Sequence, residues 1–131
     1  MDELFSLRGR TALVTGGAHG IGFSMGLALA RAGATLVFNS SRADHRDEGV
    51  RAYRDAGVAE AEAGPIDILV NNAGVIQRTE LCRMEASDFR RVVDVDLVAP
   101  FLMAREVLPG MVRRGHGKII NVCSLMSEVG R

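Results

Sequence analysis

The chain has 131 residues, enough for one domain with a hydrophobic core, and its formal net charge is zero. This balance gives no electrostatic reason to expect a nucleic acid or an anionic membrane as partner. No apolar run reaches membrane-spanning length and the first residues do not resemble a signal peptide, so we expect a cytoplasmic protein. The two cysteines lack metal-type spacing, which predicts no metal site and reduced, partly buried thiols.

The first half of the chain predicts two strands and two helices in alternation. An apolar run predicts a strand at 10–15, and small residues predict a helix at about 20–32, which Gly33 ends. A second buried strand is predicted at 34–38. A polar turn follows it, and then a helix at 43–56.

The second half predicts a linker, two more strands and one long helix. Residues 58–65 predict a helix tail or a linker, and strands are expected at 66–70 and 118–124. Between these strands Ser87 is expected to cap a long helix, which Pro109 interrupts or ends. Strands that alternate with helices indicate an α/β fold, in which right-handed crossovers build a parallel sheet. Short, continuous apolar strands are typical of a sheet that is covered on both faces.

A glycine-rich stretch lies between the first predicted strand and the first predicted helix. Residues 15–22 have the sequence TGGAHGIG, with the spacing G-x-x-x-G-x-G. Glycine permits a sharp turn, and without a Cβ the backbone N–H groups can come close to a phosphate. The N-terminus of the next helix adds unpaired donors and a partial positive charge. The stretch therefore predicts a pyrophosphate-binding loop, with a tight turn that binds no ligand as the alternative.

Two further motifs follow later strands. Residues 71–74, Asn-Asn-Ala-Gly, come directly after the third predicted strand, and residues 119–124 form an apolar strand that ends at Ser124. In this order, and together with the glycine-rich stretch, they resemble the short-chain dehydrogenase/reductase family over nearly the whole chain.

The amino-acid sequences of three other segments, 4–7, 93–101 and 115–131, resemble the gluconate 5-dehydrogenase branch of that family. The resemblance implies an NAD(P)-dependent oxidoreductase that transfers a hydride between the nicotinamide and an alcohol or ketone of a small-molecule sugar acid. It also implies a Rossmann-like parallel sheet with helices on both faces, here truncated to about four strands in the order 2-1-4-5 of the family's labels. The resemblance further implies a homo-oligomer for full-length members, with the long helix as part of the subunit interface.

The resemblance also assigns roles to single residues. Those expected at the cofactor are Gly16, Gly20, Ile21 and Gly22 around the pyrophosphate and Asn72, Ala73 and Gly74 beside the adenine ribose. Ser124 would hydrogen-bond the reacting carbonyl or hydroxyl, with Ser127 as its rival. Asp96 stands where most of the family has an asparagine that supports a proton-relay water, and local capping or pairing is its alternative role.

Cofactor preference depends on the end of the second strand, where an acidic residue would accept hydrogen bonds from the ribose 2′-hydroxyl. This chain has Ser40 and Arg42 there instead. Arg42 could pair with a 2′-phosphate, helped by His19 of the glycine-rich stretch, which favours NADP over NAD; its alternative is a solvated turn residue. Arg78 and Arg131 could meet a substrate carboxylate, with surface arginine as the alternative.

Two departures from the family pattern concern catalysis and completeness. The family uses Tyr-x-x-x-Lys, in which the tyrosine is the general acid/base and the lysine lowers its pKa. The one tyrosine here, Tyr53, is followed four residues later by Gly57, and the one lysine is Lys118. Residues 58–64 are also too few for the βα unit of about 30 residues that the family places there. We therefore expect an incomplete NAD(P)-binding Rossmann domain over 1–131, with an internal deletion near 58–64 and without the C-terminal half.

Three functions stay open at this point. The chain is a partial gluconate 5-dehydrogenase-type enzyme, a non-catalytic NAD(P)-binding module or interaction protein, or the product of a truncated gene without activity. The missing tyrosine–lysine pair predicts no turnover from this chain alone. His45 and His116 are expected to be exposed rather than functional, and exposed sheet edges predict poor solubility or a need for partners.

Overall fold

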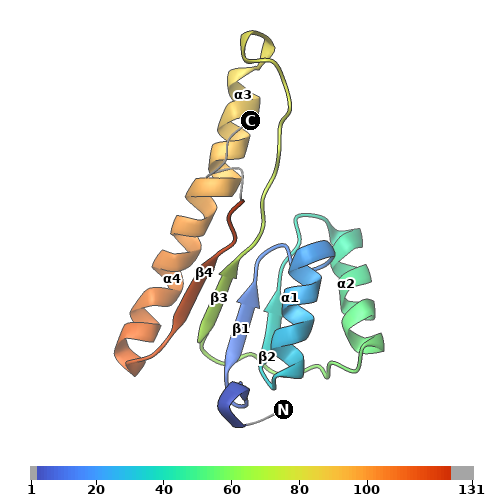
Figure 1. Cartoon of the computed structure of the whole chain (residues 1–131), viewed down its shortest axis with the longest axis vertical. Coiled ribbons are helices and arrows are strands. Elements are labelled where there is room, and N and C mark those ends of the chain that lie inside the picture. The colour runs from blue at the N-terminus through green and yellow to red at the C-terminus, as the bar shows by residue number, and fades with distance from the viewer. Residues whose placement is uncertain (1–2, 125–131) are drawn as a thin grey trace.

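Four parallel strands form one sheet in the order β2-β1-β3-β4 (Figure 1). The strands are β1 (Thr11–Val14), β2 (Thr35–Phe38), β3 (Ile68–Asn71) and β4 (Lys118–Asn121). The computed structural model describes residues 3–124, so Ser127 and Arg131 lie outside the described residues. The order confirms the predicted 2-1-4-5 arrangement, because β3 and β4 take the places of the family's fourth and fifth strands.

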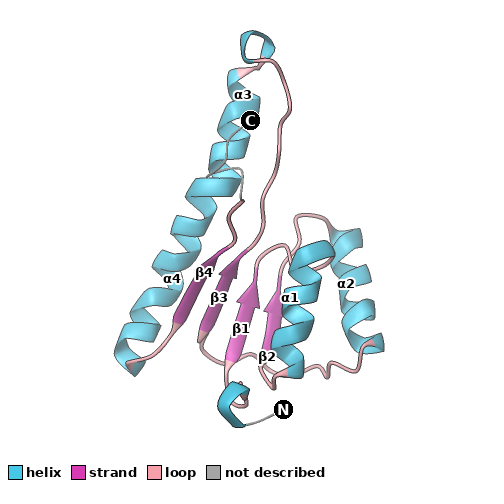
Figure 2. Cartoon of the chain, in the orientation of Figure 1, coloured by secondary structure: helices cyan, strands magenta, loops and turns pink. Residues whose placement is uncertain are grey.

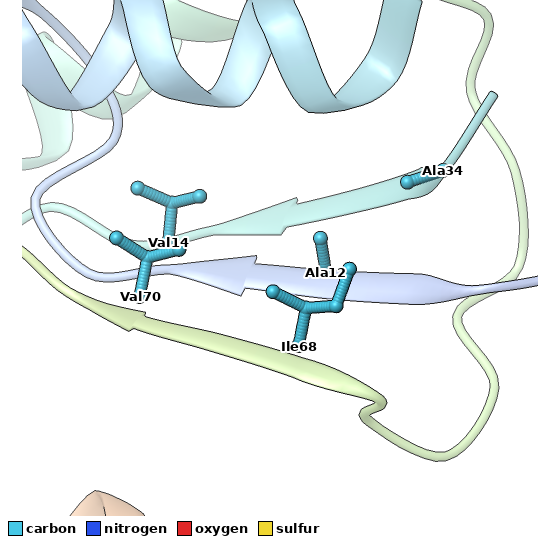
Figure 3. Close-up of a cluster of buried hydrophobic side chains, with 5 residues drawn as sticks. All are labelled: Ala12, Val14, Ala34, Ile68 and Val70. Atoms are coloured by element: carbon cyan, nitrogen blue, oxygen red, sulfur yellow. The ribbon is translucent and has the colours of Figure 1, made fainter. Parts of the chain in front are cut away.

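The hydrophobic core lies on the two central strands, β1 and β3. Ala12 of β1 pairs with Leu36 of β2 on one side and with Ile68 of β3 on the other. Figure 3 shows the side chains of Ala12, Val14, Ala34, Ile68 and Val70 clustered on this part of the sheet. Met25 and Leu29 pack against the cluster from the helix that follows β1. Burial on both sides explains why these strands are continuous apolar runs.

Two helices accompany the first half of the sheet, α1 (Gly20–Arg31) and α2 (Ala43–Asp55). α1 contacts β1 and β2 and lies over the core cluster in Figure 3. The α2 helix brings Tyr53 into the interior, where the side chain is 4% exposed. Residues 58–66, between α2 and β3, contain no helix or strand, which favours the linker over the helix tail.

The second half contains one continuous helix made of three parts (Figure 2). These are α3 (Ala86–Val93), a π-helical turn (Asp94–Val98) and α4 (Ala99–Arg114), and α4 contacts β3. Glu85 rather than Ser87 precedes the first helical residue, so the predicted cap was wrong. The prediction for Pro109 was also wrong, since the helix continues past it to Arg114 and ends before Gly115, which has a left-handed φ of 71°. Arg105 and Pro109 are exposed, so water can satisfy the carbonyl that a proline leaves without a donor.

One side of the molecule exposes much apolar surface. All four residues of β4 are exposed, and β4 is an edge strand. Exposed apolar side chains of the long helix are Phe89, Leu97, Val98, Phe101, Leu102, Leu108 and Val112. Cys82 and Cys123 are exposed as well, contrary to the partly buried thiols that were expected. Within residues 3–124 no helix combines the length and the apolar character needed to cross a bilayer.

Candidate functional site

The glycine-rich stretch forms the turn between β1 and α1. Gly16 and Gly20 have φ values of 64° and 58°, a region that L side chains rarely adopt. Gly22, in the first turn of α1, lies close to both the glycine-rich turn and the loop after β3. A Cβ on Gly22 would lie 2.5 Å from Asn72 Nδ2 and would collide with the carbonyl of Gly16. The helix therefore begins in direct contact with the turn because this residue has no side chain.

Thr15 joins the glycine-rich turn to the loop after β3. Its hydroxyl oxygen accepts hydrogen bonds from the backbone N–H groups of Asn72 and Ala73, both at 3.0 Å. The Asn72 side chain returns a hydrogen bond from Nδ2 to the Thr15 carbonyl at 2.9 Å. Two segments more than 50 residues apart are thus held at fixed distance. The sequence alone predicts no role for Thr15, because no local pattern shows that a loop so far along the chain would reach it.

A cleft of about 540 Å³ opens where β1, β2 and β3 end. Its lining residues are Gly16, His19, Gly20, Ile21, Gly22, Asn39, Ser40, Ser41, Asn72, Ala73, Gly74, Val75, Arg91 and Val95. The chain leaves β1 toward β2 on one side and returns to β3 on the other, and ligands of α/β sheets bind outside the carboxyl ends of strands at such a reversal. The structure brings together every residue predicted at the cofactor except Arg42.

Arg42 is engaged beside the cleft rather than in it. Its guanidinium forms two hydrogen bonds with the carboxylate of Asp44, one of them from Nε at 3.0 Å. The contact with Arg42 and, to a smaller extent, the hydrogen bond from the His45 N–H lower the pKa of the Asp44 carboxyl to about 2. Contact between Arg42 and a cofactor phosphate would therefore require the arginine to leave or share this exposed ion pair.

Asn39 is a site residue that sequence reasoning treated only as part of a polar turn. It directly follows β2, and its Oδ1 accepts a hydrogen bond from the Gly16 N–H at 2.9 Å. The contact orients the first glycine of the turn toward the end of β2. Its position immediately after a predicted strand was the one available signal.

The described residues predicted for catalysis and substrate are not among those that line the cleft, although Asp96 contacts one that does. Asp96, in the π-helical turn, accepts a hydrogen bond from the Val75 N–H at 2.9 Å and so ties the long helix to the loop after β3. Ser124 lies three residues beyond β4, and Arg78 is an exposed residue of the irregular segment before α3. None of the three residues lines the cleft.

Tyr53 has a structural position. Its hydroxyl donates a hydrogen bond to the Gly17 carbonyl at 2.7 Å, and its ring contacts those of Phe23 and Phe38. Burial raises the pKa of Tyr53 to about 12. Lys118 begins β4 beside Ile68, at the end of the sheet opposite the cleft. These two side chains cannot act together as an acid/base pair at the cleft.

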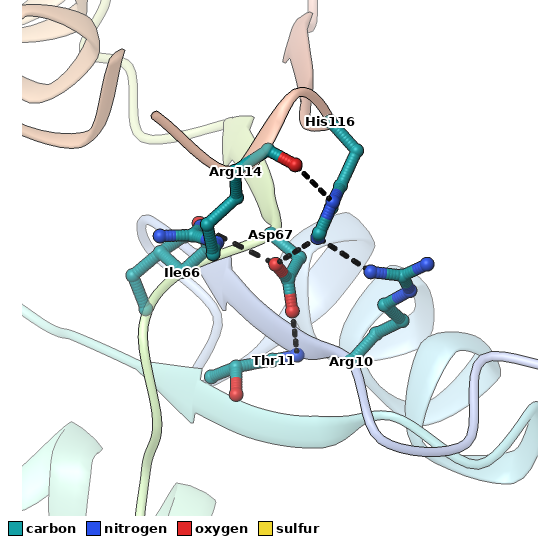
Figure 4. Close-up of polar contacts among 6 residues, drawn as sticks. All are labelled: Arg10, Thr11, Ile66, Asp67, Arg114 and His116. Carbon is teal, nitrogen blue, oxygen red and sulfur yellow. Dashed lines mark hydrogen bonds and ion pairs between the residues drawn. The ribbon is translucent and has the colours of Figure 1, made fainter. Parts of the chain in front are cut away.

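A polar cluster closes that opposite end of the sheet (Figure 4). Asp67 accepts hydrogen bonds from the Thr11 N–H at 3.1 Å and from Arg114 at 3.3 Å, and lies 3.0 Å from His116 Nε2. Burial alone would raise the pKa of the Asp67 carboxyl, but the hydrogen bonds from Thr11 and His116 and the charge of Arg114 outweigh it and lower the pKa. The cluster ties β1, β3 and the end of α4 together. Among residues 3–124 no set of three or more His, Cys, Asp or Glu side chains is placed to hold a metal.

Comparison with known proteins gives a consistent set of relatives. The family model described as short chain dehydrogenase matches residues 51–131. The 2-dehydro-3-deoxy-D-gluconate 5-dehydrogenase of Formosa agariphila is 47% identical over 151 aligned positions, which cover 98% of this chain and 57% of that protein. The gluconate 5-dehydrogenase of Gluconobacter oxydans is 39% identical over 98% of this chain and 59% of its own length.

Solved structures give the same picture. The gluconate 5-dehydrogenase of Burkholderia cenocepacia, in complex with NADP and tartrate, is 39% identical with a TM-score of 0.85, over 97% of this chain and 58% of that one. The 2-keto-3-deoxy-D-gluconate dehydrogenase of Streptococcus agalactiae is 48% identical with a TM-score of 0.81, over 97% and 56%. The chain thus spans less than two thirds of the length of the relatives it matches.

Proposed function

The chain belongs to the short chain dehydrogenase family, and from this premise we propose that it holds the cofactor-binding part of a sugar-acid dehydrogenase. The proposed reaction of the whole protein is hydride transfer between NAD(P) and a secondary alcohol or ketone of a gluconate-type acid. The names of the relatives support this substrate class, since they act on gluconate or 2-dehydro-3-deoxygluconate.

The observation that carries the proposal is the fit of the cleft to a dinucleotide. The first turn of α1 has no side-chain cap, so its backbone donors are left for a ligand at the Gly20–Gly22 end. Gly22 leaves no room for a Cβ and Gly16 has a left-handed φ of 64°, so glycine keeps the backbone of this turn open to a pyrophosphate. Asn72, Ala73 and Gly74 line the other wall, beside the expected adenine ribose. When bound, the nicotinamide cofactor supplies the hydride donor or acceptor.

NADP is the proposed cofactor ahead of NAD. The polar residues Ser40 and Ser41 line the cleft where an acidic side chain would disfavour a 2′-phosphate. The Burkholderia cenocepacia relative was solved with NADP, which supports the same preference. The ion pair between Arg42 and Asp44 weighs against a direct role for Arg42.

The proposed state of this chain is binding without turnover. Tyr53 is buried against the glycine-rich turn and Lys118 lies at the far end of the sheet, so these two residues supply no general acid/base pair at the cleft. Asp96 and Ser124 stay proposed catalytic-side residues, and Arg78 and Arg131 proposed substrate residues. A non-catalytic NAD(P)-binding module is therefore the second candidate function. The positions of Tyr53 and Lys118 favour it.

We also propose that the domain is incomplete near 58–64. The connection over 58–66, which contains no helix or strand, supports this. The alignment with the Formosa agariphila relative also supports it, because its 151 positions exceed the 131 residues of this chain and therefore include gaps in it. The exposed apolar side chains of the long helix, such as Phe101 and Val112, support a homo-oligomer of the whole protein through this helix.

Cofactor binding is tested by titrating the 131-residue chain with NADPH and NADH and following nicotinamide fluorescence. We expect saturable binding, with no oxidation of NADPH in the presence of 5-ketogluconate beyond a blank without protein. Gly22→Ala is expected to weaken binding by about tenfold or more, equivalent to about 1.4 kcal/mol, because the new Cβ displaces α1 from Asn72.

Gly64→Ala is the matched control, because its Cβ would meet Thr11 Oγ1 at an ordinary 3.4 Å and lies away from the cleft. Circular dichroism checks that each variant is folded. A folded chain that binds neither cofactor at millimolar concentration contradicts the binding proposal. Turnover above the blank contradicts the proposed inactivity.

A further inference from the structure

One arginine lines the cleft from the helix that follows the loop after β3. Arg91 lies in α3, and Val95, four residues later on the same side of the helix, lines the cleft with it. In Figure 1, α3 and α1 lie on opposite sides of the loop after β3. Arg91 therefore belongs to the wall opposite the glycine-rich turn.

The charge of Arg91 is not used within the fold. Among the described residues that line the cleft, Arg91 is the one with a permanently charged side chain. Asp88 and Asp94 lie three residues before and after it on the same helix, but neither pairs with it. Its guanidinium forms no hydrogen bond or ion pair with any residue of 3–124, so it is available to a ligand.

The helix that carries Arg91 is held against the loop after β3. α3 continues without a break into the π-helical turn, where Asp96 accepts a hydrogen bond from the Val75 N–H at 2.9 Å. Val75 and Val95 both line the cleft and are partly buried. The guanidinium is therefore carried by a fixed and largely apolar part of the cleft wall.

The two walls of the cleft offer different chemistry to a ligand. At the glycine-rich turn, the uncapped start of α1 offers backbone N–H donors, which suit phosphate oxygens. Beside α3 the lining is Val75, Val95 and Arg91. Valine side chains offer nothing to a phosphate oxygen, whereas apolar carbon and the plane of a guanidinium both suit the face of an aromatic ring. Nucleic-acid bases stack on arginine planes in this way.

We propose that Arg91 sets the base preference of the cleft by stacking its guanidinium on the adenine ring of the cofactor. This inference rests on the proposed function, since it assumes that a dinucleotide occupies the cleft with its adenosine beside Asn72, Ala73 and Gly74. A purine has a larger ring face than a pyrimidine, so the contact favours purine nucleotides. Arg91 acts here through its plane as well as its charge.

The test compares ADP with UDP, which share the ribose and the pyrophosphate and differ in the base. Each nucleotide is titrated into the 131-residue chain by calorimetry. We expect ADP to bind about threefold or more tightly than UDP, the size of effect that a partly exposed cation–π contact produces. The chain has one tyrosine and no tryptophan, so the ultraviolet absorbance of adenine can be followed directly and should decrease when the ring stacks.

Variants of Arg91 separate the plane of the side chain from its charge. Arg91→Ala is expected to weaken ADP binding by about threefold or more and UDP binding less, so that the ratio approaches one. Arg91→Lys keeps the charge without the plane and should lose most of the base preference. Arg90→Ala is the matched control, because Arg90 is the adjacent exposed arginine of α3 and does not line the cleft. It should keep both affinities.

The outcomes distinguish this inference from the proposed function. The stacking contact is overturned, and the cofactor cleft is not, if the original chain binds ADP and UDP equally well. The same holds if Arg91→Ala changes neither affinity or weakens both by one factor, or if Arg91→Lys retains the full base preference. If the folded original chain binds neither nucleotide at millimolar concentration, the proposed function fails and the inference fails with it.

Discussion

Single polar residues shape the cofactor turn at one end of the sheet and connect neighbouring elements at the other. At the cleft, Thr15 and Asn39 present side-chain oxygens to backbone N–H groups and so shape the turn that would hold a cofactor. At the opposite end, Asp67 accepts hydrogen bonds from the first residue of β1 and from Arg114, the last residue of α4. Removing an acceptor from a buried donor costs about 1–3 kcal/mol, so such residues decide stability out of proportion to their number.

Asp67→Asn tests the stabilising role of this carboxylate. Because the pKa of Asp67 is lowered in the folded state, the unfolded chain binds the proton more readily. Its contribution is therefore fully present above the unfolded pKa of about 3.9 and is lost as the pH falls through the folded pKa. We expect Asp67→Asn to lower the free energy of unfolding at pH 7 by about 1–3 kcal/mol and to reduce its loss on acidification.

Urea unfolding at several pH values measures both effects. Asp47→Asn is the matched control, because the ion pair of Asp47 with Arg46 is exposed and should contribute little. Equal unfolding midpoints for Asp67→Asn and the original chain across the acidic range would show that the cluster does not stabilise the fold.

At the level of elements, the long helix departs most from what local rules predict. Two prolines, Pro100 and Pro109, and the lack of a side-chain cap should limit it, but it runs unbroken from Ala86 to Arg114. Its middle widens into a π-helical turn, and there Asp96 reaches the Val75 N–H. Such turns are rare and occur often at functional sites, which agrees with a position beside the cleft wall.

Asp96→Ala and Asp96→Asn test whether this contact holds the loop after β3. The asparagine side chain keeps an oxygen that can accept from Val75, whereas alanine does not. We expect hydrogen exchange of the Val75 amide to become about tenfold faster or more in Asp96→Ala, and to change little in Asp96→Asn, because local opening loses one hydrogen bond. Equal exchange in both variants would mean that the hydrogen bond is not formed in solution.

For the whole molecule, the sheet ends in an unprotected edge. Every residue of β4 is exposed, and the side chain of Ile120 is 47% exposed. An apolar edge strand offers unpaired backbone groups to other chains, and a lysine on the edge discourages such pairing. We expect the chain to self-associate at high concentration and Ile120→Lys to reduce this.

Light scattering over a concentration series measures the association. Ile76→Lys is the matched control, since Ile76 is also an exposed isoleucine but lies in the irregular segment after β3. The edge is the cause if Ile120→Lys alone lowers the apparent mass. An equal decrease in both variants would instead indicate a general effect of charge.

The sequence by itself determined the alternation of strands and helices and the glycine-rich turn, whereas the strand order followed only from the resemblance to the family. It did so because apolar runs, glycine spacing and the residues after each strand are local signals. The absence of Tyr-x-x-x-Lys within the 131 residues is likewise a property of the sequence alone.

Only the tertiary structure decided how side chains distant in sequence share the cleft. Arg42 forms an ion pair with Asp44 instead of lining the cleft. Asn39 accepts a hydrogen bond from Gly16, and the ring of His45 contacts that of His19. These contacts depend on how α2 and the end of β2 pack on the glycine-rich turn. That packing is set by close approaches such as Gly49 on Ala18, which no local pattern records because they join residues far apart in the chain.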